Sequence, residues 1–387
     1  MELISLHKEE CGVTPEVIAS SPGTVNLMGE HTDYNGGYVL LLGLNKTLKV
    51  AVSRRKDNSL RFYAADYNER KRTTLANLKY KREDRWANYS KGVIFALLRR
   101  GYKIKGLDLT IKSSIPQEIG LSSSAALCAA TIAALRDLYS IDITDNEAIR
   151  IAYEAEKTFV GKEVEITEQM AVFISRANHA LFFDARALTY DYIPFNFEGP
   201  KLLLTVSNVP AVTVDAELKE LREECRHCVN LLSKKKPGTA LRDYTVQDLQ
   251  QSMGVIPENS RRLCLHVVDE NQRVLDAKEA LLEKEMIVFG KILNRSHESL
   301  RDNFEVSCPE IDWLVKRAWE IDGVLGSRLT GKGFGGCTIT LLMDHAFKAY
   351  MDRLEEYERI FGFTASTVII EPSGGTHIEM KDLRKDL

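Results

Sequence analysis

The first half of the chain consists largely of short runs with one of two patterns. In some runs apolar and polar residues alternate, and in others apolar residues cluster. Such runs are typical of β-strands. We expect strands at residues 38–44, 47–52, 61–64, 107–112, 180–183 and 201–206. Two longer segments predict helices, residues 122–139, which are rich in Ala and Leu, and residues 145–159.

The second half of the chain has a different pattern. Residues 216–321 are mostly helical in character, with a break near residues 234–238, and a strand, a helix and a strand follow at 337–343, 346–361 and 366–371. Strands first and helices later favour an α+β fold. A chain of 387 residues exceeds one ordinary core. We therefore expect two domains, residues 1–197 and 198–387, with the boundary near residues 194–200.

Composition narrows the class of protein. With 44% hydrophobic and 28% charged residues, the chain resembles soluble globular proteins. A formal net charge of −3 provides no field that would attract nucleic acid or an anionic membrane. No apolar run is long enough to span a bilayer, and the first ten residues do not resemble a signal peptide. We expect a cytoplasmic monomer that binds neither nucleic acid nor membrane.

The seven cysteines are scattered, and only Cys225 and Cys228 have a suggestive spacing. A tetrahedral zinc site needs a second pair of ligands, and no other pair in the chain has a matching spacing. A metal or redox function of this pair is the alternative. We favour reduced structural thiols, which also fits a cytoplasmic protein.

One segment carries an unusual density of polar side chains. Residues 21–37 place Glu30, His31, Asp33, Tyr34 and Asn35 between glycines. Ionised carboxylates are almost never buried without a partner, so we interpret this segment as a loop rather than as core. Its chemistry predicts the binding of a polar, hydroxyl-rich ligand.

Two further segments have the character of phosphate-binding loops. Residues 115–126 lead from a strand through a turn into a Ser-rich helix start, where unpaired N–H groups attract anions. A simple serine cap of the helix is the alternative for this segment alone. Residues 326–336 contain five glycines before a strand, which permits close approach of the backbone to a ligand or another loop.

Together these three segments resemble the motifs of galactokinases, members of the GHMP family of small-molecule kinases that includes mevalonate and homoserine kinases. Residues 86–92, 155–161 and 297–310 resemble further galactokinase segments, so the resemblance covers nearly the whole chain in order. It implies a two-domain fold with an N-terminal S5-like α/β domain, a C-terminal ferredoxin-like domain and an active site in the cleft between them. It also implies transfer of a phosphoryl group from ATP to a sugar.

The resemblance assigns roles to individual residues. Magnesium is implied at Ser124 and Glu156, and the catalytic positions are Glu168 and Thr24. The sugar contacts are implied at Glu30, His31, Asp33, Glu165 and Leu218. The nucleotide contacts are implied at Trp86, Glu118, Gly120, Leu121, Ser122, Ser123, Ser124 and Lys332.

Several of these positions depart from the family pattern. The family has Arg at Thr24, Asp at Glu168 and Gly at Glu165. It also has Tyr at Leu218, Gly at Glu118 and usually a small residue at Lys332. The extra methylene of Glu168 moves its carboxylate by about 1.5 Å, and a misplacement on the order of 1 Å can cost ~100-fold in rate. Loss of the arginine removes a charge beside the reacting hydroxyl.

These departures leave two functions open. The first is a galactokinase-like ATP-dependent sugar 1-kinase acting on galactose or a related sugar. The second is a non-catalytic or weakly active regulator that binds sugar and nucleotide on the same scaffold. Glu118 and Lys332 have opposite charges. Either they compensate each other beside the triphosphate, or they form an ion pair exposed to solvent.

Overall fold

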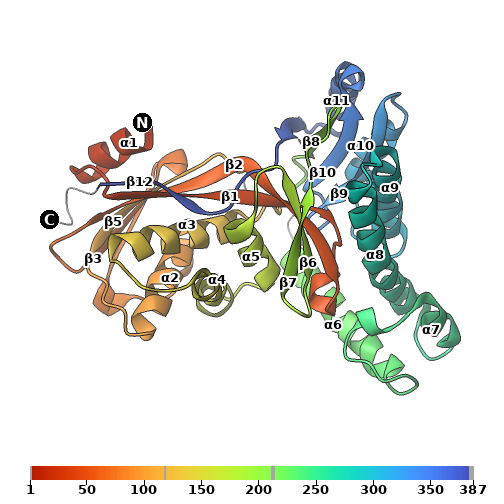
Figure 1. The fold of residues 1–387 in the computed structure, drawn as a ribbon, viewed down its shortest axis with the longest axis horizontal. Helices are drawn as coiled ribbons and strands as arrows, with labels where there is room; N and C mark the ends of the chain where they lie inside the picture. Colours follow the sequence, from red (N-terminus) through yellow and green to blue (C-terminus); the bar gives the residue numbers. More distant parts are fainter. Residues whose placement is uncertain (1, 117–118, 211–213, 383–387) are drawn as a thin grey trace.

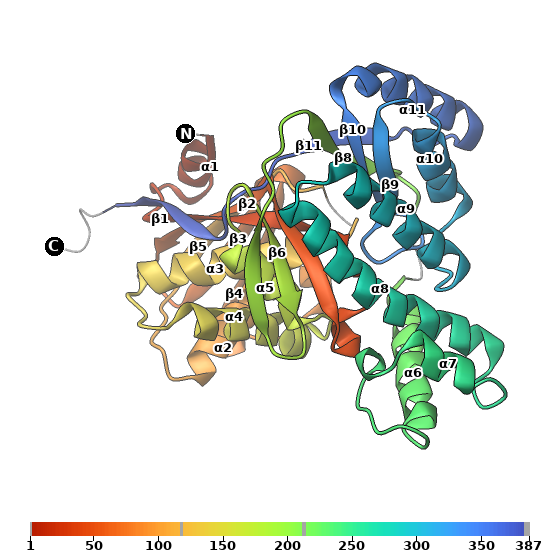
Figure 2. The same cartoon turned by 45° about the vertical axis from the view of Figure 1, so that its right-hand side comes forward.

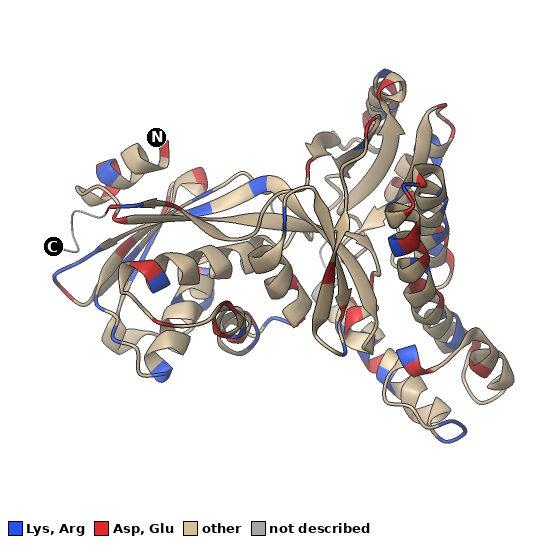
Figure 3. Ribbon diagram, in the orientation of Figure 1, with Lys and Arg blue, Asp and Glu red and all other residues tan. Residues whose placement is uncertain are grey.

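The structure is a computed structural model that describes residues 2–116, 119–210 and 214–382. It contains two β-sheets, each covered by helices (Figure 1). In this part of the chain no helix is long and apolar enough to span a membrane. Acidic and basic residues alternate along the helices and do not gather on one of them (Figure 3).

The first sheet has eight strands and is antiparallel except where β3 and β5 pair in parallel. The central path runs β12-β1-β2-β5-β3-β4, and β6 and β7 extend from β2. The strands are β1 (Val17–Met28), β2 (Tyr38–Arg54), β3 (Ser59–Ala64), β4 (Glu69–Thr74), β5 (Leu107–Ser113), β6 (His179–Asp184), β7 (Thr189–Pro194) and β12 (His377–Lys381).

One face of this sheet carries α2 (Ala87–Arg99), α3 (Ser123–Leu138), α4 (Asp145–Glu154) and α5 (Ile166–Ile174), and α1 (Glu2–Cys11) lies on the other (Figure 1). Helix α3 packs directly on β1 and β2. Its inner face is a series of fully buried alanines. These small side chains let the helix lie close to the sheet, and this contact places the start of α3 beside β1.

The second sheet is antiparallel throughout, in the order β11-β8-β10-β9. Its strands are β8 (Pro200–Val206), β9 (Val324–Thr330), β10 (Cys337–Met343) and β11 (Ser366–Ile370). Helices α9 (Met286–Asp302) and α10 (Pro309–Trp319) pack on β9, and α11 (Phe347–Phe361) packs on α10. Helices α6 (Val214–Leu232), α7 (Val246–Gln251) and α8 (Glu258–Leu282) pack together, α8 lying beside the first sheet (Figure 2).

The predicted α+β class is confirmed, and the structure corrects several predicted elements. Residues 21–28 belong to strand β1 and are not loop, and residues 38–54 form one continuous strand. The helix expected at 145–159 changes to a π-helix at Ala155–Val160. Four strands were not predicted: the polar strand β4 and the strands β7, β9 and β12.

The predicted division at residues 197 and 198 stays a prediction. The chain changes from the first sheet to the second between β7 and β8. The last strand, β12, however, returns to pair with β1, and one hydrophobic cluster contains buried residues of both halves, such as Leu42 and Phe289.

Candidate active site

A cavity of about 1200 Å³ brings the three predicted loops together. Its lining comes from the end of β1, the loop after it, the start of α3, helices α5 and α6, and the glycine-rich segment after β9. The predicted site residues that line it are Thr24, Glu30, His31, Asp33, Trp86, Gly120, Leu121, Ser122, Ser123, Ser124, Glu156, Glu168, Leu218 and Lys332. Glu165 does not line the cavity, and Glu118 lies outside the described residues.

The loop between β1 and β2, residues 29–37, is held by its own hydrogen bonds. The Thr32 hydroxyl oxygen lies 2.7 Å from the carbonyl oxygen of Gly29 and 2.5 Å from that of Tyr38, and its one proton is donated to either or shared between them. Gly37 cannot carry a side chain, because a Cβ there would lie 2.2 Å from the Asn271 amide oxygen. The loop is therefore a rigid turn between two long strands, and we call it the sugar loop.

Glu30 is the most deeply buried carboxylate of the sugar loop, with 3% of its surface exposed. It forms an ion pair with Arg328 and accepts a hydrogen bond from the Gly331 amide at 3.2 Å. Burial raises the pKa of Glu30 to about 7, although Arg328 opposes this shift. The carboxylate is buried because it has a partner, and it fastens the sugar loop to the glycine-rich segment.

Glu270 of α8 completes this buried group. Its carboxylate accepts hydrogen bonds from the Gly29 amide at 3.0 Å and the Ser296 hydroxyl at 2.7 Å, and it pairs with Arg273 at 2.6 Å. Burial would raise the pKa of Glu270, but Arg273 and the other nearby cations hold it at about 2. Sequence reasoning missed Arg328 and Glu270. The position of Arg328 inside the glycine-rich segment was the available signal.

His31 lines the cavity. Its ring stacks on Phe304 with a centroid distance of 4.3 Å, and Nδ1 lies 3.1 Å from the Tyr34 hydroxyl. Nε2 is buried and has no hydrogen-bond partner among the described residues. Burial holds the pKa of His31 well below its ordinary value. The ring is therefore neutral, with Nε2 left for a ligand.

Asp33 and Glu168 lie at the same end of the cavity. Burial raises the pKa of each to about 7; Glu165 adds to the shift of Asp33, and Glu156 adds to that of Glu168. Lys332 acts in the opposite direction on Glu168. Glu168 lies in the first turn of α5. A carboxylate with such a pKa changes protonation state near neutral pH, as a general base requires.

Arg222 of α6 is a cavity residue that sequence reasoning missed. Its guanidinium pairs with Glu165 at 2.6 Å and lies over the Tyr34 ring, 4.4 Å from the centroid. The signal was available, because Arg222 follows the predicted contact Leu218 by four residues, one helical turn. Both side chains line the cavity.

The segment at the start of α3, residues 119–124, is the predicted phosphate-binding side, and we call it the phosphate loop. Ser122 has a left-handed backbone, with φ of 53°. The Thr24 hydroxyl donates to the Ser122 hydroxyl at 2.7 Å, and Thr24 is 2% exposed. A Cβ on Gly120 would lie 3.5 Å from the Gly331 Cα, so the phosphate loop and the glycine-rich segment are adjacent.

Glu156, on the π-helix, faces the start of α3. It accepts hydrogen bonds from the Ser124 hydroxyl at 2.5 Å and the Gln169 amide at 2.6 Å. Burial raises the pKa of Glu156, and Lys332 opposes the shift. Trp86 donates to Glu69 at 2.9 Å at the rim of the cavity. No group of three or more His, Cys, Asp or Glu side chains is arranged to hold a metal in the described ranges.

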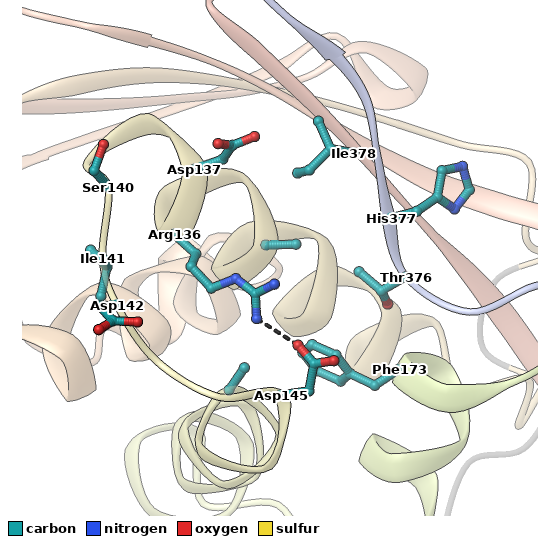
Figure 4. Close-up of a pocket in the computed structure, with 12 residues that line it drawn as sticks. Arg136, Asp137, Ser140, Ile141, Asp142, Asp145, Phe173, Thr376, His377 and Ile378 are labelled. Atoms are coloured by element: carbon teal, nitrogen blue, oxygen red, sulfur yellow. Dashed lines mark hydrogen bonds and ion pairs between the residues drawn. The ribbon is translucent and has the colours of Figure 1, made fainter.

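A second cavity, of about 490 Å³, lies between the end of α3, the start of α4 and strand β12 (Figure 4). An ion pair of 2.6 Å joins Arg136 and Asp145 at its mouth. It contains none of the predicted site residues. Cys225 and Cys228, the predicted structural thiols, are free and buried in the helical core.

Comparisons with known proteins agree with this geometry. Residues 5–54 match the galactokinase galactose-binding signature, residues 88–175 match the GHMP kinases N terminal domain, and residues 277–353 match the GHMP kinases C terminal model. The chain is 36% identical to a putative galactokinase of Treponema pallidum, covering 97% of this chain and 95% of that protein. It is 37% identical to a galactokinase of Roseiflexus, covering 99% and 98%.

Solved structures give the same result. The structure of Lactococcus lactis galactokinase complexed with galactose superimposes with a TM-score of 0.92 at 30% identity, covering 97% of this chain and 98% of that one. The mevalonate kinase of Methanococcus jannaschii shares the fold, with a TM-score of 0.68 at 20% identity and coverage of 93% and 99%. The predicted resemblance and the two-domain GHMP kinase fold are confirmed, and the chain belongs to the galactokinase family, whose members use ATP.

Proposed function

We propose that this protein is a sugar 1-kinase that transfers the γ-phosphoryl group of ATP to the anomeric hydroxyl of galactose or a related sugar. One observation carries the proposal. Glu168, a carboxylate with a pKa raised to about 7, lines the same cavity as the sugar loop and the phosphate loop. A base is thereby available between the two substrates.

In the proposed reaction the hydroxyl oxygen of the sugar attacks the γ-phosphorus. The bond between that phosphorus and the β–γ bridging oxygen breaks, ADP leaves, and the hydroxyl proton passes to Glu168. His31 Nε2 and the Asp33 carboxylate orient the sugar hydroxyls, and the phosphate loop together with Lys332 holds the triphosphate. Positioning and charge neutralisation supply most of the rate enhancement in such a reaction.

The residues at the phosphate loop fit a magnesium ion. Mg²⁺ prefers hard oxygen ligands and keeps several waters, and Ser124 and Glu156 offer a hydroxyl and a buried carboxylate that already contact each other. Bound there, the ion would neutralise charge on the phosphates. Ser124 and Glu156 are the residues that would hold it.

A second candidate function is sugar and nucleotide binding without turnover. The observation that favours it is the environment of Thr24, the residue that stands where the family carries an arginine. Thr24 is buried, and its hydroxyl donates a hydrogen bond to Ser122. This position therefore offers no positive charge to the reacting groups. A regulator on the galactokinase scaffold would need only the sugar loop and the phosphate loop.

A screen of hexoses with ATP and Mg²⁺ separates the two functions. Product formation and thermal stabilisation are measured on the same purified protein, with the Glu168→Gln variant as control. Product that depends on Glu168 supports the kinase. Stabilisation by sugar without product supports the binding protein. Product formed equally by the variant would remove Glu168 from the mechanism.

We further propose that the protein acts as a monomer in the cytoplasm. The free state of all seven cysteines supports a reducing compartment. Sedimentation at several protein concentrations tests the oligomeric state.

A further inference from the structure

The sugar end of the cavity combines carboxylates from two elements with a cation from a third. Asp33 of the sugar loop and Glu168 of α5 line the cavity there. Glu165, the residue immediately before α5, is close enough to add to the pKa increase of both carboxylates. Arg222 of α6 lines the same cavity and pairs with Glu165. An arrangement of this kind, drawn from separate elements, suits the recognition of a polar ligand.

Arg222 is fixed in place by two contacts. The ion pair with Glu165 holds one end of the guanidinium, at 2.6 Å, and the Tyr34 ring lies beneath its plane. A second carboxylate, Glu163, lies 3.9 Å away. The Arg222 side chain is 17% exposed, so it meets the cavity while most of its surface is packed. A guanidinium held in this way binds a ligand with little further loss of conformational freedom.

The guanidinium has donor capacity left over. Its Nε is buried and has no hydrogen-bond partner among the described residues. A buried donor without a hydrogen-bond partner is costly. Because Nε is buried, a ligand in the cavity would meet another atom of the guanidinium. Nη1 donates to Glu165, and Nη2 donates to no described residue, so Nη2 is the donor that an oxygen atom of a bound sugar could use.

The charge of Arg222 also acts on the carboxylates. It opposes the pKa increase that burial imposes on Asp33 and on Glu168. The other charged groups that act on Glu168 are Lys332, which also opposes the increase, and Glu156 and Glu165, which add to it. Removal of Arg222 would leave Lys332 to oppose the pKa increase of Glu168, and it would take from Asp33 the cation that opposes the increase there.

We propose that Arg222 binds a hydroxyl oxygen of the acceptor sugar and supplies the positive charge that position 24 lacks. Glu165 holds the arginine against Tyr34, so this residue, too, serves the sugar end although it does not line the cavity. The inference rests on the proposed sugar kinase function. It assigns the compensation to a residue of α6, whereas Thr24 belongs to β1, and both side chains line the cavity.

The test compares Arg222→Gln, which removes the charge, with Arg226→Gln on the same helix. Arg226 is exposed and is the matched control. We expect Arg222→Gln to lower kcat/KM for the sugar by roughly 10- to 100-fold and to raise KM for the sugar but not for ATP. The acid limb of its pH profile should move to higher pH. A merely structural role would produce none of these selective changes.

A rescue experiment sharpens the assignment. If Arg222 replaces the arginine missing at position 24, then Thr24→Arg should recover at least part of the activity in the Arg222→Gln background. Unchanged kcat/KM, KM and pH profile in Arg222→Gln would overturn the proposal. Equal losses in Arg222→Gln and Arg226→Gln would also overturn it, and thermal unfolding of both variants identifies a loss caused by misfolding.

The two variants still test the role of Arg222 if the wild type forms no product. In that case the proposed function fails, and galactose affinity is measured by calorimetry on the wild type and the two variants. Weaker binding in Arg222→Gln alone supports the contact with sugar. Equal affinities in all three proteins, or no binding of galactose by the wild type, would refute it.

Discussion

Two arginine–carboxylate groups lie near the sugar loop, and they differ in burial. In the first, Arg328 has no exposed surface and pairs with Glu30, with Glu270 at 3.9 Å. Its guanidinium also donates to the carbonyl of Leu27 at 2.9 Å and to that of Leu329 at 2.7 Å. In the second, Arg222 pairs with Glu165, lines the cavity and retains an unbonded Nε.

The difference shows that similar residues serve different purposes according to their hydrogen bonds. The first group joins β1, α8 and β9, and its carboxylates accept hydrogen bonds from backbone amides. A buried ion pair is retained only when such bonds offset its desolvation. In the second group the Arg222 side chain lines a cavity that a ligand can fill, and only its Nη1 is bonded to a carboxylate. We therefore interpret the first as a structural clamp on the sugar loop and the second as binding chemistry.

Of the changes that test this contrast, replacement of Arg328 should have the largest effect on stability. We expect Arg328→Met to destabilise the protein by about 3–5 kcal/mol, because Glu30 and Glu270 would lose a buried partner. The free energy of unfolding in urea measures it. Arg222→Met is the matched control and should cost about 1 kcal/mol or less, since its pair is partly solvated. Comparable losses in both variants would contradict the distinction between the two groups.

The next largest effect is expected on the turnover rate and not on the stability of the protein. Glu168→Gln keeps the shape of the side chain and removes its ability to accept a proton, so we expect kcat to fall by roughly 100-fold or more. Steady-state kinetics on the sugar that the screen identifies provide the measurement. Glu198→Gln, an exposed carboxylate that does not line the cavity, is the control. A variant of Glu168 with full activity would show that another group accepts the proton.

Local sequence patterns predicted the elements that depend on local chemistry. Helix α3, the strands β5, β8 and β10, and the sugar loop itself follow from apolar spacing, glycine positions and the density of polar residues. The resemblance to galactokinases then placed the predicted loops around one cavity, which the structure contains. The individual roles of these residues stay predictions.

The missed features depend on contacts between distant parts of the chain. Strand β12 forms only because β1 offers an edge more than three hundred residues away, and its own sequence is mainly polar. The carboxylate of Glu30 is buried because Arg328 arrives from β9, a pairing that neither segment reveals alone. Arg222 was not predicted for the same reason, since its partner Glu165 lies more than fifty residues earlier, immediately before α5.

A smaller effect is expected from restoring the family residues. Thr24→Arg together with Glu168→Asp should raise galactose phosphorylation by about tenfold, and by more than either change alone, because residues that act as a unit are not additive. Thr24→Arg also breaks the hydrogen bond to Ser122, which limits the gain. Initial rates with galactose measure the effect. If Glu165→Gly must be added before any gain appears, Glu165 and not Glu168 restricts the sugar.

The smallest effect is the pH dependence of stability, to which Glu168 and Glu270 contribute with opposite signs. The pKa of Glu168 rises from 4.5 to about 7 on folding, so between these values the native state binds more protons than the unfolded state. Stability due to this group therefore falls as pH increases from 4.5 to 7. The pKa of Glu270 falls to about 2, so its contribution is gained as pH increases from 2 to 4.5.

Because Glu168 lines an open cavity, solvent screening limits its share to about 1 kcal/mol. Urea unfolding at pH 5 and pH 7.5 measures it, and Glu168→Gln should flatten the decline between these values. Activity should move the other way and increase through about pH 7, as the carboxylate loses its proton. If the variant declined as steeply as the wild type, the titration would belong to Glu30 or Asp33, whose pKa values are also raised to about 7.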